Sequence, residues 1–177
     1  METAKYKTAL IVGAGEGLSA ALARLFTREG IQVALAARQT DKLDALCKET
    51  GATAYACDTT SLHDVTTLFT SVERDCGAPD VVVYNAGARL PGALVDLIPA
   101  DVEQAIAVSA FGGFLVAQQA SRRMLPNGHG AILFTGASAS EAIHNQQRSR
   151  WASSHCAVLH KAWPANCRRK ASTSHIL

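Results

Sequence analysis

A glycine-rich segment near the start of the chain has the residue types and the spacing of a phosphate-binding turn. It reads Gly13-Ala14-Gly15-Glu16-Gly17-Leu18-Ser19. Glycine suits this chemistry because a Cβ would block the approach of the backbone to a phosphate. The free N–H groups and the dipole of a following helix then attract the anion. A glycine turn alone is a weak signal, so its meaning depends on the elements that position it.

The flanking sequence predicts a strand before this turn and a helix after it. Residues 7–12 form a short apolar run rich in β-branched residues, and a second such run covers residues 32–36. The predicted helix between them has one apolar face, made of Leu18, Leu22, Leu25 and Phe26. This strand–turn–helix–strand order is typical of a dinucleotide site. The predicted pyrophosphate contacts are Gly13, Gly15, Gly17 and Leu18.

Strands and helices continue to alternate along the chain. Further helices are predicted at residues 41–49, 61–74 and 100–124, and further strands at 52–57, 80–84 and 131–135. The run 80–84 is apolar, as expected of a parallel strand whose two faces are buried. The alternation predicts an α/β fold with a Rossmann-like, doubly wound parallel sheet, truncated after about five strands.

Four features make the chain resemble the short-chain dehydrogenase/reductases over about residues 5–140. The glycine turn is similar to the family's TGxxxGxG motif, with Ser19 in place of the last glycine. Asp58 stands where the family's acid contacts the adenine. Asn85-Ala86-Gly87 resembles the NAG motif that supports the central sheet, and residues 130–140 resemble the strand that ends in the catalytic serine.

The resemblance implies an oxidoreductase that moves a hydride between a nicotinamide ring and a carbonyl or alcohol carbon. In this family a tyrosine transfers the proton, and a lysine lowers the pKa of that tyrosine and holds the ribose. A serine polarises the carbonyl, and a helix asparagine supports a proton-relay water. The phenol must titrate near neutral pH rather than near ~10, which a neighbouring cation achieves.

The chain departs from this pattern at every catalytic position. Ser109 stands at the asparagine position and Ala137 at the serine position, with Ser138 as a neighbour that can substitute only after a local shift. The Tyr-x-x-x-Lys motif is absent, because Ala157 stands four positions before Lys161. The tyrosines lie in or beside predicted strands, where packing explains them: Tyr6, Tyr55 and Tyr84. We therefore expect a cofactor half-site without an intact catalytic set.

The end of the second predicted strand bears on the choice of cofactor. An acid there would accept hydrogen bonds from the ribose and favour NAD. This chain has Arg38 instead, whose guanidinium can pair bidentately with a 2′-phosphate. NADP is therefore favoured over NAD. Glu16 in the glycine turn opposes this choice, and a solvated loop residue is the plainer interpretation of Arg38.

Residues 141–177 show no apolar period. We expect residues 1–140 to form an incomplete NAD(P)-binding Rossmann domain and residues 141–177 to form an irregular, out-of-frame tail. If the third base of each codon is joined to the first two of the next, and codons are chosen freely where the code allows, the segment from Arg148 permits FAMGKFALRGLAQSLARELQAQGIHVSH. That sequence resembles the family's lysine helix and its sixth strand. In that frame Arg148-Ser149 can encode Phe but not Tyr, so the restored protein would carry Phe-x-x-x-Lys.

Composition limits the class of protein. The length of 177 residues predicts one domain. The formal net charge of +2 predicts no strong electrostatic field around the whole chain. We expect no signal peptide and no membrane span, and a cytoplasmic location with reduced thiols. The cysteines lack metal-binding spacing, which disfavours a zinc cluster of His155, Cys156, His160 and Cys167.

Two other functions stay open. The first is a pseudoenzyme that senses NADP(H) without turnover. The second is an interaction protein whose basic tail binds nucleic acid with steep salt dependence. Solvated charge explains that tail more simply, so we expect neither nucleic acid nor a membrane as a partner. The resemblance implies a homo-oligomer for the family, which is doubtful for this chain. A small carbonyl or alcohol substrate is expected only for a full-length form.

Overall fold

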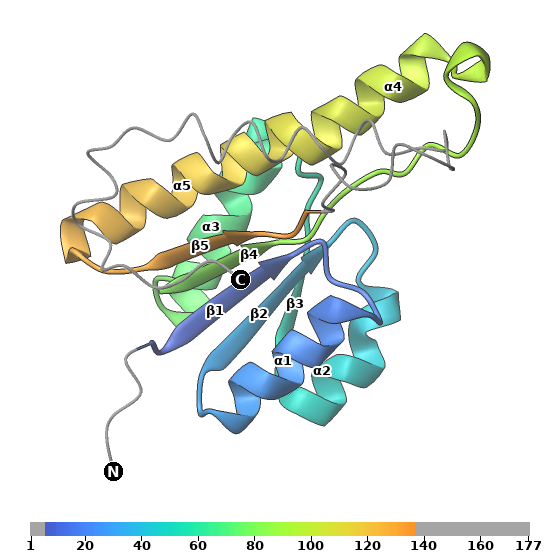
Figure 1. The fold of residues 1–177 in the computed structure, drawn as a ribbon. Coiled ribbons are helices and arrows are strands. Elements are labelled where there is room, and N and C mark those ends of the chain that lie inside the picture. The colour runs from blue at the N-terminus through green and yellow to red at the C-terminus, as the bar shows by residue number, and fades with distance from the viewer. Residues whose placement is uncertain (1–5, 137–177) are drawn as a thin grey trace.

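A computed structural model describes residues 6–136 of the chain and shows a five-stranded parallel sheet (Figure 1). The strand order is β3-β2-β1-β4-β5. The strands are β1 (Thr8–Val12), β2 (Gln32–Ala37), β3 (Thr53–Ala56), β4 (Val81–Tyr84) and β5 (Ala131–Phe134). The predicted α/β fold with a doubly wound parallel sheet is therefore confirmed.

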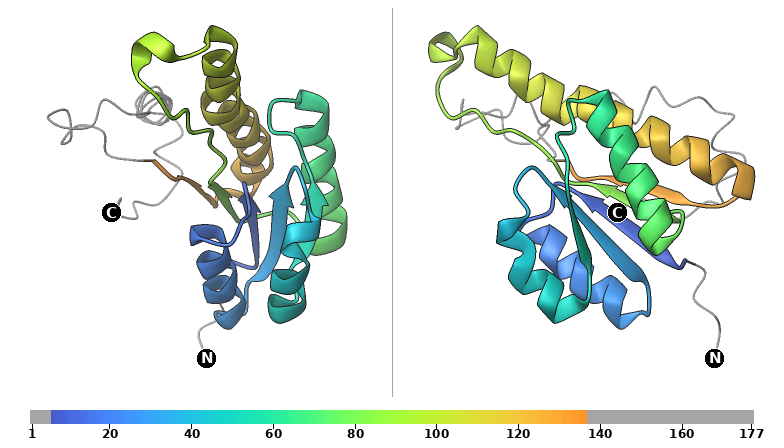
Figure 2. Two further views of the ribbon diagram at one scale, coloured as in Figure 1. Left: turned by 90° about the vertical axis from the view of Figure 1, so that its right-hand side faces the viewer. Right: turned by 180° about the vertical axis from the view of Figure 1, so that it is seen from behind.

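Helices cover both faces of the sheet. They are α1 (Leu18–Arg28), α2 (Asp44–Thr50), α3 (Leu62–Cys76), α4 (Pro99–Ile106) and α5 (Gly112–Asn127). Two 3₁₀ turns, Asp41–Leu43 and Leu94–Asp96, precede α2 and α4. Helices α1 and α2 lie on one face and α3 and α5 on the other, while α4 continues past the carboxyl edge of the sheet (Figures 1 and 2).

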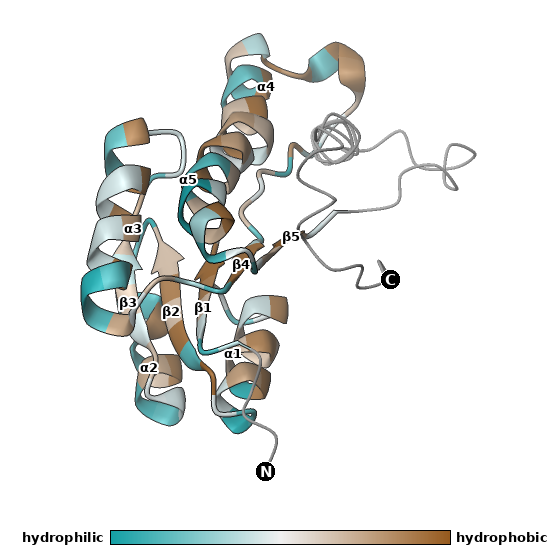
Figure 3. Cartoon of the chain, turned by 90° about the vertical axis from the view of Figure 1, so that its left-hand side faces the viewer, coloured by the Kyte–Doolittle hydropathy of each residue, from teal (hydrophilic) through white to brown (hydrophobic). Residues whose placement is uncertain are grey.

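Two buried clusters, one on each face, hold the layers together. Alternate residues of each strand point to opposite faces. Thus Ile11 and Leu35, which are register partners on β1 and β2, pack toward α1 and α2, whereas Leu10 and Val82 pack toward α3 and α5. The hydrophobic strands accordingly lie between helices that carry both hydrophilic and hydrophobic residues (Figure 3).

The predicted apolar face of α1 is only partly buried: Leu22 and Phe26 pack against the core cluster on this side of the sheet, but Leu18 and Leu25 do not. Leu18 is 52% exposed and Leu25 is 39% exposed, whereas the small residues Ser19, Ala20 and Ala23 are buried. The residues of α1 that are fully buried are small, which allows the helix to lie close to the sheet, and the larger Leu22 and Phe26 pack at the border of the contact.

The long helix predicted at residues 100–124 is not regular throughout. A π-helical turn, Ala107–Phe111, separates α4 from α5; it is called the π-turn below. The whole helical segment Pro99–Asn127 is long and apolar enough to cross a membrane by length and composition alone, with a mean hydropathy of 1.3 over its most apolar window. In this fold the apolar side of α5 has a different explanation, because Leu115 and Val116 are buried in the core beside β4 and α3.

Candidate cofactor-binding site

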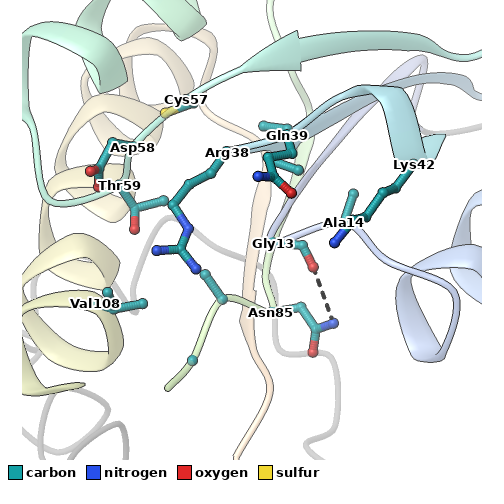
Figure 4. A pocket seen from close by; sticks show the side chains of 14 residues that line it. Gly13, Ala14, Arg38, Gln39, Lys42, Cys57, Asp58, Thr59, Asn85 and Val108 are labelled. Carbon is teal, nitrogen blue, oxygen red and sulfur yellow. Dashed lines mark hydrogen bonds between the residues drawn. The ribbon is translucent and has the colours of Figure 1, made fainter. Parts of the chain in front are cut away.

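A pocket of about 640 Å³ opens at the carboxyl edge of the sheet (Figure 4). Its walls come from the ends of β1, β2, β3 and β4 and from the π-turn. The lining residues are Gly13, Ala14, Ala36, Ala37, Arg38, Gln39, Lys42, Cys57, Asp58, Thr59, Asn85, Ala86, Gly87 and Val108. The chain winds outward in both directions from β1, and ligands of open α/β sheets bind beside such a switch point.

The three glycines of the turn differ in what the fold demands of them. Gly13 has a φ of +83°, and a Cβ placed on it would lie 2.3 Å from the backbone nitrogen of Ala86. Its own N–H donates to the Ala36 carbonyl at 2.9 Å. By contrast, a Cβ on Gly15 or Gly17 would meet no atom within 4 Å. Packing of the described residues therefore explains Gly13 alone, and it leaves open space over Gly15 and Gly17.

Helix α1 begins next to this open space. Gly17 is its N-cap residue and makes no side-chain capping hydrogen bond, and Leu18 is its first residue. The first N–H groups of a helix have no partner within the helix, so they are suited to bind an anion. Of the predicted pyrophosphate contacts, the structure places Gly13 in the pocket wall, whereas Gly15, Gly17 and Leu18 are not among its lining residues.

Two basic side chains reach the pocket from the segment after β2. The Arg38 guanidinium lies over the pocket on the side of Asp58 and Thr59 (Figure 4). Lys42, in the 3₁₀ turn before α2, points its ammonium group toward Ala14 of the glycine turn (Figure 4). Sequence reasoning missed Lys42, although a second basic residue four positions beyond Arg38 was a signal that could have found it.

Asp58 closes the pocket at the end of β3. Its Oδ1 accepts hydrogen bonds from the backbone N–H of Thr60 at 2.9 Å and from the Thr60 hydroxyl at 2.8 Å. These bonds hold the pKa of the Asp58 carboxyl below its usual range, and the positive charge of Arg38 adds to the effect. The carboxylate thus both stabilises the turn before α3 and presents negative charge at the pocket.

Cys57 also lines the pocket, in surroundings that disfavour its thiolate. Burial raises the pKa of the Cys57 thiol to about 12, with further contributions from the carboxylates of Asp64 and Asp58. Since the thiolate is the nucleophilic form of cysteine, this side chain does not serve as a nucleophile at neutral pH.

The Asn85-Ala86-Gly87 segment joins the ends of three strands. The Asn85 N–H donates to the Val12 carbonyl at 2.7 Å. The Asn85 side-chain oxygen accepts from the Thr135 hydroxyl at 2.7 Å, and its Nδ2 donates to the Ser19 hydroxyl at 2.7 Å. The segment therefore ties the glycine turn to β4 and to the residue that follows β5.

Of the two weak catalytic candidates, one lies next to the pocket wall without lining it, and the other lies outside the described residues. Ser109 is in the π-turn and is 3% exposed, and its Oγ accepts a hydrogen bond from the Ala88 N–H at 3.4 Å. It does not line the pocket, whereas its neighbour Val108 does. Ser138 lies outside the described residues.

Comparison with known proteins decides the family. The model of the short chain dehydrogenase family matches residues 7–162. The chain belongs to the short-chain dehydrogenase family. It is 34% identical over 140 residues to the mitochondrial borneol dehydrogenase of Lavandula x intermedia, covering 77% of this chain and 53% of that protein. It is also 34% identical over 142 residues to short chain aldehyde dehydrogenase 1 of Euphorbia lathyris, covering 76% of this chain and 49% of that protein.

A solved structure supports the same assignment. The short-chain type dehydrogenase/reductase from Mycobacterium marinum superposes with a TM-score of 0.80 at 31% identity, covering 88% of this chain and 66% of the other. This short-chain dehydrogenase family member thus spans about half the length of the two relatives. The family match runs past residue 140, where a domain boundary was predicted, to residue 162. Because residues 137–177 lie outside the described part, that boundary and the irregular tail stay predictions.

The tyrosines of this family member do not reach the pocket. The sequence contains three, and all of them lie among the described residues. Tyr84 is 1% exposed and donates to the Val108 carbonyl. Tyr55 bonds to Asp75 at 3.1 Å, and burial together with a bond to the Cys76 sulfur raises its pKa. Tyr6 precedes β1 and packs against the cluster under α1 and α2. None of the three lines the pocket.

Proposed function

We propose that the chain binds NADP(H) in the pocket at the carboxyl edge of the sheet and does not itself catalyse hydride transfer. Three features support the binding site: the open space over Gly15 and Gly17, the uncapped start of α1, and the polar wall at the end of β3. In such an arrangement the pyrophosphate lies against the helix N-terminus and the adenosine lies toward Asp58.

The two cations after β2 support NADP over NAD. The segment after β2 brings Arg38 and Lys42 to one pocket, and no acid stands at the end of β2, where Ala37 leads directly to Arg38. A 2′-phosphate carries up to two negative charges and three acceptor oxygens, which suits a guanidinium beside an ammonium. Glu16 places a negative charge in the glycine turn, which opposes NADP. Lys42 supplies a positive charge on the same side of the pocket.

The position of the tyrosines carries the proposal that the chain is catalytically silent. Proton transfer requires a phenol within hydrogen-bond reach of the substrate oxygen. Of the three tyrosines of the chain, Tyr84 is buried against the π-turn and Tyr55 bonds to α3. A nicotinamide cofactor bound in this pocket would supply a hydride, but these residues offer no phenolic proton beside it.

For the whole protein we propose the family's chemistry, hydride transfer between NADP(H) and a small carbonyl or alcohol compound in the cytoplasm. The names of the two relatives, both dehydrogenases, support this substrate class. For the whole protein the alternative is a sensor that binds NADP(H) without turnover, and the absence of a tyrosine from the pocket lining favours it.

Isothermal titration tests the binding proposal. We expect wild type to bind NADP⁺ more tightly than NAD⁺. Arg38→Ala and Lys42→Ala should each weaken NADP⁺ binding about ten-fold or more, because a hydrogen bond to a charged group contributes about 1.5–3 kcal/mol. They should change NAD⁺ binding little. Lys48→Ala, an exposed lysine on α2 outside the pocket, is the matched control and should bind both nucleotides like wild type.

Two results would count against the proposal. Equal binding of NADP⁺ and NAD⁺ that is insensitive to Arg38→Ala would remove the basis for NADP. Steady oxidation of NADPH by this chain in the presence of small aldehydes and ketones would contradict catalytic silence.

A further inference from the structure

Ser19 occupies a position at which the family's turn motif has glycine, and its side chain is buried among polar partners. The residue is 1% exposed. Its Oγ donates to the Gly13 carbonyl at 3.1 Å and accepts from Nδ2 of Asn85 at 2.7 Å. One hydroxyl on α1 therefore contacts both the glycine turn and the end of β4.

The hydrogen bonds continue beyond Asn85. Its side-chain oxygen accepts from the Thr135 hydroxyl at 2.7 Å, on the residue after β5. A continuous chain thus runs from Thr135 through Asn85 and Ser19 to the Gly13 carbonyl. It links α1, the glycine turn and the ends of β4 and β5; of these, the glycine turn and the segment after β4 line the pocket.

Removing the Ser19 hydroxyl would remove the 2.7 Å hydrogen bond that joins Asn85 to α1. The Asn85 amide would keep one contact in the turn, a 3.5 Å bond to the Gly13 carbonyl. A partly buried amide donor with only so long a bond is poorly satisfied. The side-chain link between the start of α1 and the end of β4 would then be lost.

The location of Ser19 in the turn motif connects its hydrogen bonds with ligand binding. In dinucleotide-binding turns the last glycine allows close contact between helix and strand. Here a side chain intervenes, and its hydroxyl makes directed bonds to the facing backbone and amide. Ser19 also lies in the first turn of α1, whose N-cap Gly17 makes no side-chain capping bond.

We infer that Ser19 is a positioning residue for the cofactor pyrophosphate. Its hydroxyl fixes the start of α1 relative to Gly13 and Asn85, and so fixes the N–H groups on which the pyrophosphate lies. The inference rests on the proposed binding of NADP(H). It assigns to Ser19 no direct contact with the cofactor.

The test compares two ligands within each variant. NADP⁺ contains the pyrophosphate, whereas adenosine 2′-monophosphate contains only the portion that Arg38 and Asp58 would bind. Dissociation constants for both are measured by ligand-observed NMR on wild type, Ser19→Ala and Ser19→Gly. The ratio of the two constants within one variant does not depend on the folded fraction, so loss of stability cannot imitate a positioning effect.

We expect both variants to weaken NADP⁺ binding about three- to ten-fold, the equivalent of one hydrogen bond, and to leave adenosine 2′-monophosphate binding unchanged. Ser19→Gly provides the second variant because glycine is the family residue at this position and leaves no steric obstacle to folding. Ser121→Ala is the matched control. The Ser121 hydroxyl is buried on α5 and has no hydrogen-bond partner within the described part of the chain.

Each outcome is decisive. A ratio unchanged from wild type in either Ser19 variant overturns the inference, as does an equal change in Ser121→Ala. If wild type binds neither ligand, the proposed function itself fails, which is distinguishable from failure of the role of Ser19.

Discussion

Replacing Gly13 by alanine should lower the stability of the fold, whereas the same change at Gly15 should leave the stability unchanged and weaken only nucleotide binding. The Cβ of an alanine at position 13 would lie 2.3 Å from the backbone nitrogen of Ala86, 2.5 Å from its Cα and 2.6 Å from the carbonyl carbon of Asn85. All three are backbone atoms, so no side-chain rotation relieves the overlap.

The magnitude follows from two costs. A non-glycine residue held at positive φ, as at +83° here, costs about 1–2 kcal/mol. Forcing an extra carbon into a packed region costs about 1–3 kcal/mol. Together these lower the free energy of unfolding by about 2–5 kcal/mol, against a total of about 5–15 kcal/mol for an ordinary domain. For a chain of this size the melting temperature should fall by roughly 4–20 °C.

Urea unfolding monitored by circular dichroism measures this difference. Gly15→Ala is the matched control, since its Cβ would meet no atom within 4 Å and its φ is not positive. We expect an unfolding midpoint close to that of wild type for Gly15→Ala, with NADP⁺ binding weakened about ten-fold because the methyl group obstructs the pyrophosphate. The reasoning is refuted if Gly13→Ala is as stable as wild type, or if Gly15→Ala loses stability while keeping its affinity for NADP⁺.

Three further predictions concern other parts of the chain. Tyr84→Phe removes the donor to the Val108 carbonyl in the π-turn and should lower the free energy of unfolding by about 1–2 kcal/mol in urea titrations; an unchanged midpoint would mean that the hydroxyl contributes nothing. Because backbone and side-chain hydrogen bonds from Thr60 lower the folded-state pKa of Asp58, this carboxylate stabilises the fold above its unfolded pKa of about 4, and that stability is lost as the pH falls through the folded pKa. Asp58→Asn should therefore be less stable than wild type at pH near 7 and equal to it in strong acid, and a difference that persists in acid would contradict this. Finally, the coding DNA for residues 141–177 should read, in the shifted frame, as a family-like lysine helix and strand; stop codons or an unrelated sequence in that frame would eliminate the frameshift hypothesis.

The sheet could be predicted because its signals are local. Each strand is a short apolar run bounded by glycine or polar residues, and the capping sequence before α3 is visible as Ser61 followed by Asp64. In the structure the Ser61 hydroxyl accepts from the Asp64 N–H at 3.2 Å, as its position suggests. Local signals of this kind fix element type and order, and the alternation then restricts the topology.

What the sequence did not predict depends on contacts between distant segments. The bond between Ser19 and Asn85 joins residues 66 positions apart, and no local pattern indicates it. The π-turn interrupts a helix that was predicted to be continuous over residues 100–124. The fully buried residues of α1 are small ones such as Ala20 and Ala23, which the apolar pattern of the helix did not indicate.

The residues of the candidate site could be predicted where they belong to a motif. They could not be predicted where a side chain enters the pocket from a neighbouring turn. The turn glycines, Asp58 and Asn85 are placed by their order after successive strands. Lys42 enters the pocket only because the 3₁₀ turn before α2 directs it back toward Ala14 (Figure 4).

The central claim is that NADP(H) binds at the carboxyl edge of the sheet, and an NMR titration of the ¹⁵N-labelled chain with NADP⁺ tests it most directly. The account predicts saturable shifts that are largest at the amides of the glycine turn and the start of α1, at Arg38 and at Asn85-Ala86-Gly87, with small shifts on the outer faces of α3 and α5. An absence of saturable shifts, or shifts centred on α3 and α5, would contradict it.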